Sequence, residues 1–206
     1  MRKHEVREMK ELLTELGKDA ANVIRSRPAP AEAVMRAFCD ALEKRTGRPI
    51  DMLFRAFPPE LHVSGLRLDL GDRSMIVVEE NTTVESKLVI LGHELYHEAK
   101  GDCHHATAGI PAAARALTDA PDESAIQRAA ELILASKNVP LDAVRAVSAR
   151  LSADAHETSA ESFGLLFGVA VRTWVEGLPY AQSPTTAATV EGRLKLSLGN
   201  RSGLLQ

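Results

Sequence analysis

The most regular hydrophobic pattern in the chain lies between residues 86 and 100. Its apolar positions recur every three or four residues, at Leu88, Leu91, Leu95 and Ala99. This spacing lines one face of an α-helix, so the pattern predicts an amphipathic helix. Gly101 is suited to cap its C-terminal end. An N-terminal cap is expected from Asn81, Thr82 or Thr83.

The same spacing predicts several further helices. One covers residues 5–25, and a second covers residues 31–44 with Gly47 as its C-terminal cap. Cys39 lies beside Phe38 in the second helix, and we interpret it as a small core residue rather than a nucleophile. Later helices are predicted at residues 122–137, 141–151, 154–174 and 190–198.

Between residues 50 and 78 the pattern changes from a helical period to alternation. Residues 50–57 form a predicted extended segment before Pro58 and Pro59. Residues 63–70 alternate, a turn containing Gly71 follows, and residues 75–78 are largely β-branched, which predicts a hairpin. The chain is therefore expected to have an α+β fold that is mostly helical, with a small antiparallel sheet packed against the helix at 86–100. The hairpin either exposes an edge for an extended substrate or only covers that helix.

The polar face of this helix carries an H-E-x-x-H motif. His93 and His97 are one turn apart, roughly opposite the apolar stripe, with Glu94 beside them. Two imidazoles in this arrangement can bind one Zn²⁺, and the carboxylate can accept a proton from a metal-bound water. The motif is typical of zinc metallopeptidases. The alternative is an amphipathic helix whose polar face carries two histidines by chance.

A third ligand is expected from the helix at 154–174. Its apolar stripe comprises Ala160, Phe163, Phe167, Ala170, Val171 and Trp174. One turn earlier the stripe meets Glu157, and a carboxylate that faces a core needs a partner such as a metal ion. Two His and one Glu form a gluzincin-like zinc set. Alternatively, Glu157 belongs to a capping box with Asp154, and His156 is the other candidate ligand.

The loop after the first metal-binding helix holds more candidate residues. His104 and His105 are possible auxiliary groups, either as a further ligand or as stabilisers of an oxyanion. A polar loop without chemistry is the alternative, and we prefer it for Cys103. Zn²⁺ is the expected metal, with Mn²⁺ or Fe²⁺ as alternatives, since geometry and availability decide between them.

Composition narrows the function classes. The 206 residues are 45% hydrophobic and 26% charged, with a net charge of −3 and two cysteines. These values describe an ordinary globular protein without a disulfide framework, and no basic stripe predicts direct nucleic-acid binding. No apolar run is long enough for a membrane span, and the charged N-terminal residues are unlike a signal peptide. We expect a cytoplasmic protein.

Three stretches resemble the ImmA/IrrE family of bacterial metallopeptidases: the hairpin at 63–78, the run at 88–97, and residues 157–164, which are similar to a downstream E-x-x-A-x-x-F-A helix. The resemblance covers about residues 50–175. It implies a metal between two helices, with Glu157 completing the site, and cleavage of a DNA-binding repressor under stress. Actinobacterial relatives are often labelled toxin components of toxin–antitoxin systems.

The chain departs from the family in two places. The long spacing between His97 and Glu157 implies a helical insertion at about 106–150, and Tyr96 stands where relatives usually carry Gly. The expected organisation is an N-terminal helical segment at 1–48, a metallopeptidase domain at 49–178 and a tail at 179–206. The expected function is zinc-dependent cleavage of a regulatory protein. The alternatives are a non-proteolytic binding module that acts on a partner regulator and a purely structural metal site.

Overall fold

The computed structural model describes residues 3–57, 64–101, 146–147 and 155–179, with side chains at 155–157 and 146–147 excluded. Several predictions lie outside these residues. They are the candidate residues Cys103, His104 and His105, the cap Asp154, the helices at 122–137 and 190–198, and nearly all of the insertion at 106–150.

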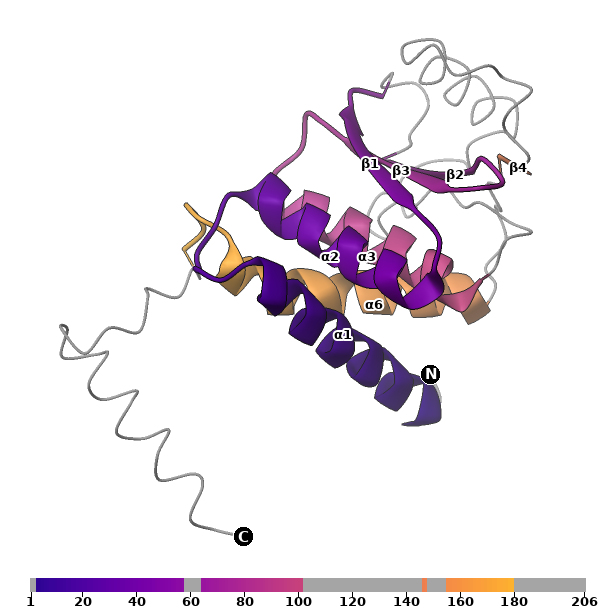
Figure 1. The fold of residues 1–206 in the computed structure, drawn as a ribbon, viewed down its shortest axis with the longest axis horizontal. Helices are drawn as coiled ribbons and strands as arrows, with labels where there is room; N and C mark the ends of the chain where they lie inside the picture. The colour runs from indigo at the N-terminus through magenta and orange to yellow at the C-terminus, as the bar shows by residue number, and fades with distance from the viewer. Residues whose placement is uncertain (1–2, 58–63, 102–145, 148–154, 180–206) are drawn as a thin grey trace, which may run out of the picture.

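The described elements form an α+β fold that is mostly helical, as the sequence predicts. In chain order they are α1 (Lys3–Val23), α2 (Ala31–Thr46), β1 (Ile50–Arg55), β2 (Gly65–Asp69), β3 (Ser74–Glu79), α3 (Val84–Lys100), β4 (Ala146–Val147), α6 (Ala155–Val171) and the short 3₁₀ helix η3 (Arg172–Trp174). Figure 1 shows these α-helices on one side of the sheet, with α2 and α3 next to the strands and α6 beyond them. Among the described residues, no helix has the length and apolarity needed to cross a bilayer.

The sheet has the strand order β1-β3-β2-β4 and is mixed. The predicted hairpin is present, because β2 and β3 pair antiparallel with Leu68 opposite Met75. However, β1 pairs parallel with β3, so the sheet is not wholly antiparallel as predicted. Strand β3 lies between β1 and β2 in the sheet. Because the hairpin makes β3 run opposite to β2, β3 runs in the same direction as β1.

Strand β4 corrects part of the predicted helix at 141–151. Ala146 and Val147 pair antiparallel with Asp69 and Leu68 of β2. An unpaired strand edge offers backbone donors and acceptors, and this long-range pairing overrides the local helical pattern.

One hydrophobic core joins the helices to the sheet. It includes Met9 and Leu16 of α1, Phe38 of α2, Leu91 of α3 and Phe167 of α6, each at most 2% exposed. The Phe38 and Phe167 rings meet edge to face, with centroids 4.8 Å apart. The first two helices therefore share their core with the helix that carries the H-E-x-x-H motif.

The end of α6 is joined to the connection between α1 and α2. The backbone N–H of Ala29 donates to the carbonyl of Trp174 at 2.8 Å, and the N–H of Glu176 donates to the carbonyl of Ala29 at 2.9 Å. The Arg27 guanidinium carbon lies 3.2 Å from the centre of the Trp174 ring, a cation–π contact. These contacts fix the C-terminal end of α6 against the N-terminal helices.

Helices α3 and α6 run antiparallel and approach closely through glycines. A β carbon added to Gly164 would lie 2.6 Å from the Val89 carbonyl oxygen, and one added to Gly92 would lie 2.7 Å from Cβ of Phe167. Such distances are too short for real atoms. The helices can therefore pack at this separation only because these positions lack side chains.

We predict that Gly164→Ala destabilises the protein, because the helices must separate to admit the methyl group. Overpacking of this kind costs about 1–3 kcal/mol. The control is Gly17→Ala in α1, where an added β carbon meets nothing within 4 Å. That change should stabilise by about 0.5–1 kcal/mol. Urea unfolding measures both, and a Gly164→Ala variant as stable as the Gly17→Ala variant would contradict the close packing.

Candidate metal centre

Helix α3 has the boundaries and caps expected from its sequence. The Thr83 side chain accepts a hydrogen bond from the Ser86 N–H at 3.2 Å, which selects Thr83 among the three predicted caps. Gly101 ends the helix in the left-handed conformation, with φ of 66°, and its N–H donates to the Glu98 carbonyl. Both ends of the helix that carries the motif are therefore fixed by local contacts.

His93 and His97 bring their ring nitrogens together. Their Nε2 atoms are 3.2 Å apart, the ring centroids are 4.8 Å apart, and the residues are 5% and 4% exposed. Two nitrogens bound to one tetrahedral Zn²⁺ are separated by about 3.3 Å, given bonds of about 2.0–2.1 Å. The pair thus has the spacing that a shared metal ion requires. In the metal-free protein the same distance suits a hydrogen bond between one ring N–H and the other ring nitrogen.

Glu94 is fully buried on the side of α3 that faces the sheet. Strand β2 passes directly beside it at Gly65. A β carbon added there would lie 3.0 Å from the Glu94 Oε1 and 2.5 Å from Cγ2 of Ile90. Only glycine allows the strand this close to the carboxylate. Sequence reasoning missed Gly65, although a glycine at the start of an alternating strand signals a close backbone approach.

Helix α6, whose first turn contains the predicted third ligand, packs against α3. A β carbon on Gly164 would lie 3.3 Å from Cβ of His93, so α6 passes beside the histidine pair. Glu157 belongs to the first turn of α6, seven residues or about two turns before Gly164. Since the helices are antiparallel, this turn lies toward His97. The side chains of Glu157 and His156 are outside the described residues, and the choice between them stays a prediction.

The described side chains do not by themselves complete a metal site. Among them, no group of three His, Cys, Asp or Glu residues is arranged to bind one ion. The structure brings the His93 and His97 rings together, while Glu94, next to His93 in the chain, faces β2. The histidine pair fits a zinc site that takes its third ligand from the first turn of α6.

Tyr96 packs between α3 and α6. It is 4% exposed, and its ring centroid lies 5.2 Å from that of Phe163. Its hydroxyl forms a hydrogen bond with the Ser159 side chain, and burial raises its pKa above the usual value. The ring thus fills the space between the two helices that would hold the metal, which explains the bulky residue inside the motif.

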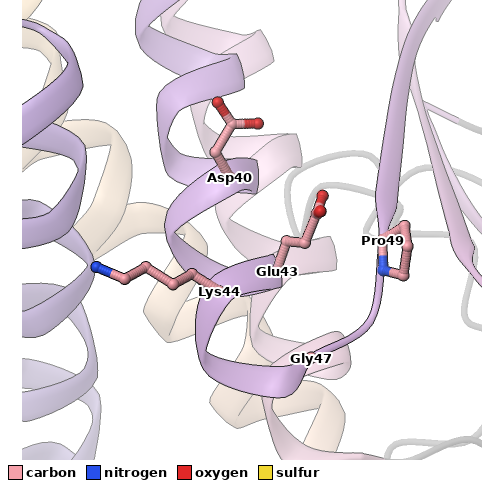
Figure 2. Close-up of a pocket in the computed structure, with 5 residues that line it drawn as sticks. All are labelled: Asp40, Glu43, Lys44, Gly47 and Pro49. Atoms are coloured by element: carbon pink, nitrogen blue, oxygen red, sulfur yellow. The ribbon is translucent and has the colours of Figure 1, made fainter.

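Cys39 and the pocket nearby offer no comparable chemistry. The thiol is 2% exposed, and burial, reinforced by Asp40, raises its pKa to about 12, which confirms a core residue. Figure 2 shows the five residues that line a pocket between α2 and β1: Asp40, Glu43, Lys44, Gly47 and Pro49. Glu43 accepts a hydrogen bond from the Ile50 N–H at 3.3 Å, and Lys44 points away toward Asp19 of α1. The polar residues of this pocket therefore help to join α2 to β1.

No family model, curated protein or solved structure matches the chain.

We predict that Tyr96 matters mainly for packing. Tyr96→Phe should cost about 0.5–1.5 kcal/mol, the usual loss for one hydrogen bond. Tyr96→Gly should cost at least about 3–5 kcal/mol, since it removes a buried ring and places glycine inside a helix. Chemical denaturation of both variants measures this. A Tyr96→Gly protein with wild-type stability would show that the ring has another role.

Proposed function

We propose that the protein is a zinc-dependent endopeptidase in which His93 and His97 bind the metal and Glu94 acts as general base. The observation that carries the proposal is the 3.2 Å separation of the two histidine Nε2 atoms, with the buried Glu94 next to them. Glu157 is the proposed third ligand and His156 is the alternative. Mn²⁺ or Fe²⁺ are the alternative metals, although sites of this kind generally bind them with lower affinity than Zn²⁺.

The chemistry follows from the donor set. When bound, Zn²⁺ would polarise the scissile carbonyl and lower the pKa of the attacking water. Glu94 accepts a proton from that water and then delivers it to the leaving amine nitrogen.

The edge of β2 supports an extended polypeptide as substrate. On the side away from β3, described strand pairing is limited to Leu68 and Asp69, which pair with β4. The preceding part of the strand, at Gly65 and Leu66, is the part beside Glu94. A substrate segment added there by main-chain hydrogen bonds would pass next to the general base. We propose a cytosolic regulatory protein as substrate, in line with the family that the motifs resemble.

We predict that Glu94→Gln retains the metal but loses cleavage. The amide keeps the size of the side chain and cannot accept the proton, so the rate should fall by at least about 10²–10⁴-fold. The assay incubates the purified protein with a candidate DNA-binding repressor and follows fragments by mass spectrometry. Cleavage at the wild-type rate would refute the mechanism. Binding of the repressor without fragments from either protein would favour action by association.

We predict that His93→Ala and His97→Ala each lower Zn²⁺ affinity by at least about 10–100-fold, because each removes a direct ligand. The control is His4→Ala, since His4 lies on the exposed side of α1 and contacts Glu8 at 3.4 Å. Metal content after dialysis and competition with a chelator measure the effect. Glu157→Ala and His156→Ala in the same assay identify the third ligand. A Zn²⁺ affinity equal to that of wild type in both the His93→Ala and the His97→Ala variant would exclude the site.

A further inference from the structure

A second set of buried charges adjoins the candidate metal centre. The side chains of Arg67 on β2 and Glu98 on α3 are 2% and 3% exposed, and Arg67 Nη1 lies 2.7 Å from Glu98 Oε2. The Ser74 hydroxyl donates to the same oxygen at 2.6 Å. Arg48 Nη1 lies 3.6 Å from Glu98 Oε1, and Arg48 is in turn paired with Asp69. Both carboxylate oxygens of Glu98 are thus held by groups from the sheet side.

The pair belongs to a row of contacts that runs along α3. Ile90, Glu94 and Glu98 follow one another at four-residue spacing and face the sheet. Gly65 meets Ile90 and Glu94, while Arg67, two residues further along β2, meets Glu98. Two strand residues span about 6.7 Å and one helical turn about 5.4 Å. The distance from Gly65 to Arg67 along β2 is therefore similar to one turn of α3, so Arg67 reaches the turn after the one that Gly65 contacts at Glu94.

We infer that Arg67 and Glu98 are positioning residues for the metal centre: their ion pair sets the register of β2 on α3, and so fixes the turn of His97 and the place of Glu94. Glu98 directly follows His97 in the chain, and Gly65 can lie against Glu94 only while the strand keeps this register. The inference rests on the proposed function, since the groups positioned are its ligand and its base.

A purely stabilising role accounts for the pair less well. Removing two charges from water is expensive, and apolar residues of similar volume often replace a buried ion pair without loss of stability. Apolar residues do not reproduce the directional contact that a guanidinium makes with a carboxylate. A guanidinium holds a carboxylate at one angle and distance, so this pair can fix the turn of α3 that carries His97. Loss of residues that orient metal ligands typically lowers metal affinity by about 10–100-fold.

The test is the full-length double variant Arg67→Met/Glu98→Met, which leaves neither charge unpaired. Co²⁺ is the probe, because its visible absorption reports coordination geometry. We expect the variant to fold, to bind Co²⁺ at least about 10-fold more weakly and to show a shifted spectrum. The control is Glu32→Gln, which breaks the exposed 3.0 Å pair with Arg36 and should leave both readouts unchanged. A folded double variant with Co²⁺ affinity within about twofold of wild type and an unchanged spectrum overturns the inference.

A second readout separates this inference from the proposed function. In the metal-free protein, the ring nitrogen NMR signals of His93 and His97 report the placement of the two imidazoles. The double variant should shift them, and unchanged signals would overturn the inference. If wild-type protein fails to bind Co²⁺ through His93, the proposed function fails, and the ring signals alone decide the positioning role. If the double variant does not fold, Arg67→Lys supplies the same comparison with the charge retained and the planar geometry lost.

Discussion

The structure depends on the close approach of backbone to α3 from two sides. On one side, Gly164 brings α6 within contact of Val89 and His93. On the other side, Gly65 brings β2 against Ile90 and Glu94. Glycine is otherwise unfavourable inside a helix or strand, since it loses more conformational freedom on folding than other residues. Its presence at both contacts shows that short separation, not local stability, determines these positions.

A consequence of this enclosure is that α3 is buried nearly all round. From Leu88 to Glu98 only Val89 is not buried, and the buried set includes His93, Glu94, His97 and Glu98. Ionisable groups in such surroundings need partners, because water no longer solvates them. These contacts come from three directions. The His93 and His97 rings contact each other, and Arg67 of β2 and Ser74 of β3 bind the Glu98 carboxylate. Helix α6 packs against the turn of α3 that carries His93. The helix therefore combines a core position with polar chemistry.

Local signals in the sequence predicted a large share of this arrangement. Helix α3 and its end at Gly101 follow from local sequence patterns, which also limited its N-terminal cap to three neighbouring residues, of which the structure selects Thr83. The parallel pairing of β1 with β3 and the short strand β4 depend on contacts between distant segments, and alternation alone does not specify a strand's neighbour. Glu98 was missed for the same reason, because its partner Arg67 is 31 residues away and neither residue has an unusual sequence context.

The contact between residues 27–29 and the end of α6 joins the N-terminal helices to the region that carries the motifs. Ala29 bridges to Val175, and Arg27 covers the ring of Trp174, the sole tryptophan of the chain. A chain shortened to begin at residue 49 would expose Phe167 and Trp174 and release the far end of the helix that contacts His93. The first 48 residues thus pack into the same hydrophobic core as the region that carries the motifs, and they cover the side of α6 that faces away from the sheet.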